Sequence, residues 1–209
     1  MKLLHRDDLY GWSVFDEARE IDFHSVLWVR DGGNVAVDPL PMSDHDRVHL
    51  SSLGSLATIV VTNSDHVRGA AELAEAHEAE LVGPAGEQDR FPVECRRWLS
   101  DGDQVVPGLT AIALDGSKTP GELALVLETT TLITGDLVRA HQGGRLCLLP
   151  DRKLSDKTRA LASVARLAEL PHIEAVLVGD GWPIFSGGAS ALRALVGRNE
   201  SSSGSPFAT

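Results

Sequence analysis

Several polar side chains follow apolar runs of the chain, at places where strands are expected to end. The runs NVAV, ATIVVT, TLIT and AVLV are followed by carboxylates, an amide and an imidazole, and the loop GSKTPGE adds an amine. These residues are Asp38, Asn63, Asp65, His66, Lys118, Asp136 and Asp180. Carboxylates and an imidazole that share a cleft can bind a metal ion, transfer protons or pair with a cation.

The position of these side chains favours one shared site. Polar residues just past buried strands converge on one edge of a sheet, where ligand sites usually form. Buried aspartate and histidine also need a cation or a hydrogen-bond partner. Each residue has a structural interpretation as well, since Asp38 and Asp180 could form turns and Asp65 could cap a helix. Their repetition after apolar runs points instead to a functional site.

The elements that must position this site alternate in character along the chain. Residues 25–30 and 34–38 are predicted to form a hairpin around Asp31-Gly32-Gly33. Apolar runs predict strands at 57–62, 81–82 and 173–178, and helical spacing predicts helices at 44–53, 67–79, 155–170 and 189–196. Short runs at 109–114, 123–127 and 131–134 predict an antiparallel meander. Two sheets flanked by helices fit this order better than one parallel sheet does.

The length and charge of the chain limit its partners. Its 209 residues suit a single domain over 1–200, followed by a polar tail over 201–209 that we expect to be disordered. The net charge of -11 disfavours nucleic acids and anionic membranes. Two cysteines and no signal-like apolar run favour the cytoplasm. The remaining expected partner is a small-molecule substrate, and a homo-oligomer stays open.

Four sequence segments resemble the metallo-β-lactamase fold superfamily of hydrolases. TNSDHVRGA is similar to its H-x-H-x-D-H loop, KTPGE to its H-T-P-G loop, TGD to its third motif, and VGDGWPI to its final G-H-G segment. The chain looks closest to a divergent hydrolase branch that carries TNSDH and GSKTPGELAL. The resemblance implies an α/β fold, a four-layer αββα sandwich with the site at one edge.

The resemblance also implies a degenerate metal site. Val61, Asn63 and Lys118 stand where the superfamily has the three histidines of its first metal, so that metal position is expected to be lost. The second position keeps four possible ligands, which are Asp65, His66, Asp136 and Asp180. Three carboxylates and one imidazole suit Mn²⁺ or Fe²⁺, and zinc remains compatible.

Two functions follow from these substitutions. In the first, one divalent metal supports hydrolysis of an ester, thioester, amide or phosphoester, with Asp65 and Asp136 as catalytic residues. Arg139 and Trp182 are then expected to bind the substrate, while Asp38 and Asn63 support the site. In the second, no metal binds, Lys118 neutralises the carboxylates, and the protein is a scaffold or binding protein without catalysis.

Overall fold

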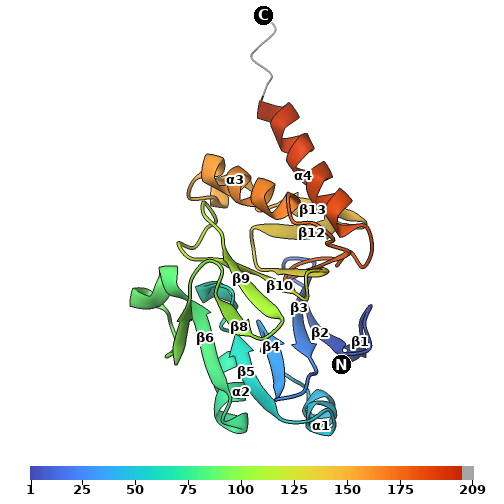
Figure 1. Cartoon of the computed structure of the whole chain (residues 1–209), viewed down its shortest axis with the longest axis vertical. Helices are drawn as coiled ribbons and strands as arrows, with labels where there is room; N and C mark the ends of the chain where they lie inside the picture. The colour runs from blue at the N-terminus through green and yellow to red at the C-terminus, as the bar shows by residue number, and fades with distance from the viewer. Residues whose placement is uncertain (204–209) are drawn as a thin grey trace, which may run out of the picture.

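The computed structural model describes residues 1–203, and describes side chains through Asn199. Its layers are two sheets with a pair of helices on each outer face, as Figure 1 shows with α1 and α2 at one end and α3 and α4 at the other. The predicted four-layer αββα sandwich is therefore confirmed. None of the helices within residues 1–203 is both long and apolar enough to cross a membrane.

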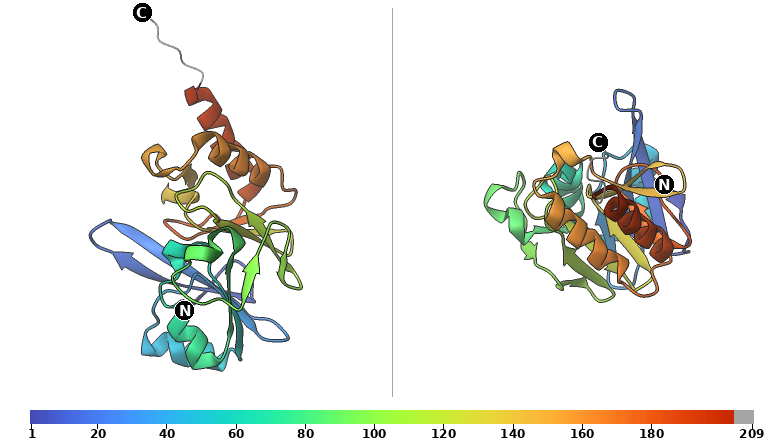
Figure 2. Two further views of the ribbon diagram at one scale, coloured as in Figure 1. Left: turned by 90° about the vertical axis from the view of Figure 1, so that its left-hand side faces the viewer. Right: turned by 90° about the horizontal axis from the view of Figure 1, so that it is seen from above.

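The first sheet has seven strands in chain order. They are β1 (Lys2–Leu3), β2 (Leu9–Asp16), β3 (Ile21–Trp28), β4 (Asn34–Val37), β5 (Leu56–Val60), β6 (Glu80–Pro84) and β7 (Arg97–Leu99). Strands β3 and β4 form the predicted antiparallel hairpin, whereas β4, β5 and β6 are parallel. Helices α1 (Asp44–Ser52) and α2 (Ala70–His77) cover the outer face. The end of the β2–β3 hairpin projects from the body in Figure 2.

The second sheet contains the predicted meander. Its strands run in the order β14 (Ala175–Val178), β11 (Thr131–Thr134), β10 (Leu123–Leu127), β9 (Leu109–Ala113) and β8 (Gln104–Val106). Strands β8 to β11 pair antiparallel, and β14 joins β11 in parallel. Helices α3 (Lys157–Ala168) and α4 (Gly188–Ser203) cover its outer face. The α4 helix overlaps the expected tail at 201–203, and residues 204–209 lie outside the described residues.

The region from Arg139 to Arg145, for which the sequence analysis predicted no strand, is part of a hairpin. It includes most of β12 (Val138–Gln142) and the start of β13 (Arg145–Leu148), which pair as a separate two-stranded ribbon. The ribbon packs on the α3–α4 side, where Val138, Ala140 and Leu146 join the apolar cluster under those helices. This matters for the site because Arg139 lies on a strand, where the pairing with Cys147 fixes its backbone.

Three apolar layers hold the sandwich together. The central layer joins the inner faces of the two sheets and includes Val37, Val60, Leu123, Leu125 and Leu177, all nearly inaccessible to water. The two outer layers join each sheet to its helices. Burying side chains of this size removes apolar surface from water on both faces of each sheet, the largest favourable contribution to folding. The polar site therefore lies at an edge between layers, outside this apolar interior.

Candidate functional site

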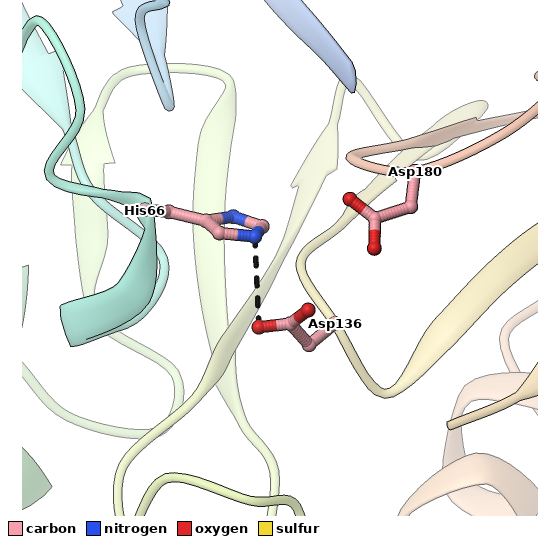
Figure 3. Close-up of side chains that lie close together, drawn as sticks. All are labelled: His66, Asp136 and Asp180. Atoms are coloured by element: carbon pink, nitrogen blue, oxygen red, sulfur yellow. Dashed lines mark ion pairs between the residues drawn. The ribbon is translucent and has the colours of Figure 1, made fainter. Parts of the chain in front are cut away.

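The site forms where parallel strands of both sheets end. Asp38 follows β4, His66 lies on the 3-10 turn Ser64–His66 just beyond β5, Asp136 follows β11 and Asp180 follows β14. Because β4 is parallel to β5 and β11 is parallel to β14, each pair delivers its polar residues to the same edge. His66, Asp136 and Asp180 point toward one another in Figure 3.

Two glycines let the two sheets approach each other at this edge. A Cβ atom on Gly135 would lie 2.8 Å from the Thr62 hydroxyl, and one on Gly179 would lie 2.9 Å from Cε1 of His66. Neither distance is compatible with an ordinary Cβ contact. The glycines of the TGD and VGDG segments are thus required by packing against the first sheet, and they place the following aspartates beside His66.

Asp38 is the structural support of the site. Its carboxylate accepts hydrogen bonds from the Thr62 backbone NH at 2.7 Å and from the Thr62 hydroxyl at 2.6 Å. The same carboxylate lies 2.7 Å from Nδ1 of His66. Asp38 has a φ of +47°, a conformation that aspartate tolerates better than most residues. These contacts fix the imidazole so that Nε2 faces Asp136 at 3.5 Å.

Asn63 directly precedes the turn that carries Asp65 and His66. Its side chain is fully buried and accepts a hydrogen bond from the backbone NH of Asp65 at 3.0 Å, which caps the 3-10 turn. The cap holds the turn that presents both Asp65 and His66. Asn63 therefore acts on the site through the backbone.

Basic side chains contact the candidate ligand carboxylates. The Lys118 ammonium lies 2.6 Å from Asp65 and 2.8 Å from Asp136. Asp180 is the remaining candidate ligand. Its carboxylate forms an ion pair with Arg139, and Arg68 lies 3.8 Å from it. Asp136 and Asp180 are almost completely buried, so these cations supply the compensation that buried carboxylates require.

The pKa values of the site reflect this network of charges. Burial alone would lower the pKa of His66, but Asp38 and Asp136 raise it to about 9. Burial would raise the pKa of Asp136, but His66 and Lys118 hold it well below its usual value. Behind them, burial and the nearby Asp136 raise the pKa of Glu122 to about 7. An ionised Asp136 between two cations is the favoured state of this centre.

The predicted residues occupy different parts of the site. His66, Asp136 and Asp180 each offer a ligand atom within 4.8 Å of the others, whereas Asp65 is outside this cluster and its carboxylate is 55% exposed. Arg139 lines the cavity over the cluster. Trp182 is 63% exposed, does not line that cavity, and lies against Gly143.

Arg68, Thr62 and Glu122 are among the site residues that were not anticipated from the sequence. Arg68 lines the cavity, and its backbone has a φ of +33°. This unusual backbone angle could not be predicted from the sequence. Thr62 joins Asp38 to the first sheet, and its presence in VTNSDH could have suggested this role. Glu122 ends the GSKTPGE segment and accepts a hydrogen bond from the backbone NH of Leu137 at 2.8 Å.

The profile of the Metallo-beta-lactamase superfamily matches residues 1–198. The chain belongs to the metallo-beta-lactamase superfamily. No curated protein matches it. The predicted resemblance of the chain to this superfamily is therefore confirmed.

Solved structures of this superfamily share the fold of the chain. DIM-1 metallo-beta-lactamase superposes with a TM-score of 0.72 at 14% identity, covering 93% of this chain and 95% of that one. A metallo-beta-lactamase from Pontibacter korlensis gives 0.72 at 14% identity, with coverages of 94% and 97%. ETHE1 from Myxococcus xanthus gives 0.63 at 21% identity, with coverages of 83% and 76%. At these identities the likeness shows the fold alone.

Members of the metallo-beta-lactamase superfamily typically bind zinc, so the fit of this site to a divalent metal needs a test. The donor set is small but suitable, because one imidazole and two carboxylates lie within reach of a common point. The charges are unsuitable, because Lys118 and Arg139 already contact Asp136 and Asp180. A divalent ion on the same oxygens would lie against an ammonium and a guanidinium. With these two cations in place, the site does not fit a metal.

Proposed function

We propose that this superfamily member works without a metal and that its centre is a binding site for a small molecule, held together by internal ion pairs. The observation that carries this proposal is the position of Lys118, whose ammonium lies within 2.8 Å of both Asp65 and Asp136. One amine of the chain takes over the charge compensation that a bound cation would provide.

The second candidate is hydrolysis supported by one divalent metal at His66, Asp136 and Asp180. The grouping of these three side chains favours it. For this candidate, Lys118 and Arg139 would have to leave the carboxylates that they contact. Breaking two pairs with buried carboxylates is costly, which is why the metal-free centre is the better-supported function.

Metal content and thermal stability test the proposal together. The protein is produced in medium supplemented with zinc and manganese, and bound metals are measured by mass spectrometry before and after dialysis against a chelator. We expect far less than one equivalent of metal and an unchanged melting temperature after chelation. Hydrolysis of ester, thioester and phosphoester substrates should also show no stimulation by added Zn²⁺ or Mn²⁺.

One bound equivalent of metal, with a lower melting temperature after chelation, would overturn the metal-free centre, because a ligand that binds only the native state stabilises it. Asp136→Asn would then show whether the metal lies at this centre. The matched control is Asp151→Asn, which changes an exposed carboxylate whose partner is Lys157.

A further inference from the structure

The cavity above the ion-paired centre has more positive than negative side chains, although the chain as a whole is acidic. We propose that this cavity binds the phosphate group of a small phosphomonoester. This inference rests on the proposed metal-free function and names the class of small molecule that the site takes.

The charge balance of the cavity is the first argument. A space of about 470 Å³ is lined by three carboxylates and by five basic side chains, which are Arg19, Arg68, Lys118, Arg139 and Lys153. His66 also lines it, with its partner Asp38 behind, so this pair leaves the balance unchanged. The lining therefore has two more positive than negative side chains, and of the positive ones Arg19 also lies 3.7 Å from Asp16, outside the lining, in a largely exposed pair. A phosphomonoester near neutral pH carries about two negative charges, which matches this surplus.

Arg139 supplies the second argument. Its residue is only 7% exposed, and its Nε has no hydrogen-bond partner among the described residues. A buried donor without a partner is unfavourable, whereas a guanidinium donates readily to oxyanions. Because Arg139 lines the cavity, an anion placed there could accept this bond. The orphaned donor thus points to an acceptor supplied by a ligand.

Arg68 and Arg19 are held at the cavity by one aromatic ring. Their guanidinium carbons lie 5.1 Å and 5.7 Å from the centre of the Phe23 ring. The backbone of β3 fixes this ring, because His24 donates to Gly179 and Gly181 donates to Asp22 across the edge of the site. Arg68 also donates to the carbonyl of His24 at 3.3 Å. This arrangement limits the freedom of the arginines before a ligand arrives, which lowers the entropic cost of binding.

The apolar part of the cavity favours an organic phosphate over inorganic phosphate. Ile21, Phe23 and Leu40 line the same space as the basic side chains. The organic group that is esterified to the phosphate can cover these apolar surfaces while the phosphate contacts the arginines. Forked guanidinium donors suit the geometry of phosphate oxygens, so the phosphate end is assigned to the arginine side.

Calorimetric titration of chelator-treated protein tests the inference, with inorganic phosphate, phenyl phosphate and benzoate as probes. We expect saturable binding of both phosphates, with phenyl phosphate tighter because it reaches the apolar lining. Benzoate has the ring but only one negative charge, and it should bind much more weakly than phenyl phosphate. Equal binding of benzoate and phenyl phosphate would overturn the assignment to a phosphate.

Two variants identify the binding residues. Arg68→Gln should weaken phenyl phosphate binding by at least about tenfold, the loss expected when a hydrogen bond to a charged group is removed. Because the Arg68 side chain is only 13% exposed, a second variant changes accessible groups of the cavity alone. This variant is Arg19→Gln/Lys153→Gln. It should weaken binding and make it less sensitive to salt. The control Lys2→Gln/Arg193→Gln removes the same charge from exposed positions outside the cavity and should leave binding unchanged.

The outcomes separate this inference from the proposed function. Phosphate binding that disappears after chelation and returns with Zn²⁺ would overturn the metal-free function. Protein that lacks metal but shows no saturable phosphate binding would overturn the inference and leave the metal-free function standing. Equal loss of binding in the cavity variant and in its control would also overturn the inference.

Discussion

The Lys118 ammonium lies 2.8 Å from the carboxylate of Asp136, and the same ammonium reaches Asp65 at 2.6 Å. Lys118 comes from the loop between β9 and β10, whereas Asp136 follows β11, so the contact joins two connections of the second sheet. Asp136 is buried and Lys118 is partly exposed, which makes the lysine the accessible member of the pair. Changes at Lys118 therefore test the charge balance of the centre without removing an apolar core side chain.

Removing the amine should destabilise the protein and create a need for an external cation. Lys118→Ala leaves Asp136 buried without its closest positive partner, and we expect a loss on the order of 3–5 kcal/mol in the free energy of unfolding. Added Zn²⁺ or Mn²⁺ should restore part of the loss by binding beside His66, Asp136 and Asp180. Thermal melting with and without these ions measures both effects.

Lys157→Ala is the matched control for this change. Lys157 pairs with Asp151 at 2.7 Å, but both side chains are largely exposed. Exposed pairs contribute about 0–1 kcal/mol, so this variant should melt close to the native protein and ignore added metal. If Lys118→Ala behaves like Lys157→Ala, the amine does not compensate the centre.

The stability of the protein should fall as the pH rises from mildly acid to alkaline values. The pKa of Glu122 rises from 4.5 to about 7 on folding, so its contribution to stability is complete below pH 4.5 and is lost as the pH rises through 7. The pKa of His66 rises from 6.5 to about 9, and its contribution is lost between these values. Asp136 acts in the opposite sense, since its lowered pKa stabilises the fold above pH 3.8.

Glu122→Gln separates these contributions. It removes the titrating group but keeps an acceptor for the backbone NH of Leu137. Melting temperatures measured from pH 4 to pH 9 should lose their slope between pH 4.5 and 7 and keep the slope that His66 causes above pH 6.5. Glu94→Gln, which changes an exposed carboxylate, should retain the full native profile. An unchanged slope in Glu122→Gln would show that this carboxyl does not titrate as described.

The charge of Asp38 should matter more than its shape. Asp38→Asn keeps the size of the side chain and tolerates the positive φ, but it removes the negative charge that faces His66. We expect a loss of several kcal/mol, on the order of that for breaking a buried ion pair. Chemical denaturation measures the loss, with Asp31→Asn in an exposed turn as the control. Equal stability of the two variants would argue against an ionised pair at Asp38 and His66.

A methyl group at Gly179 should disturb the site directly. The added Cβ would lie 2.9 Å from Cε1 of His66, so Gly179→Ala must displace the imidazole or the strand end. The expected loss is about 1–3 kcal/mol, typical of overpacking. Gly197→Ala is the control, because a Cβ there meets no atom within 4 Å and α4 should gain about 1 kcal/mol from it. Melting of both variants against the native protein decides whether Gly179 is a packing requirement.

Much of the fold and the grouping of the site could be predicted from the sequence. Apolar runs ending in Asp38, His66, Asp136 and Asp180 obey the general rule for strand ends, and the structure brings these four residues to one edge. Lys118 could be placed near them because the KTPGE segment resembles a motif of the superfamily. These predictions depend on chain order and on alternation of apolar and polar residues, which are visible in the sequence.

Other features depend on geometry that the sequence does not show. Strands β2, β7, β8, β12 and β13 were not predicted, because they are short or half-exposed and lack a clear alternation. Arg19 lies in the connection between β2 and β3, and it lines the cavity from there. Arg68 reaches it through an unusual backbone angle. The positive character of the cavity follows from these placements and was not anticipated.

The close approach at Gly135 and Gly179 has a consequence for folding as well as for binding. The two halves of the sandwich touch there through Thr62, Asn63 and His66, with no room for another carbon atom. The edge that receives a ligand is therefore also a contact surface between the two sheets. A ligand bound there contacts residues of both sheets. A bound ligand should slow the separation of the two sheets, so the rate of unfolding should report whether a ligand is bound.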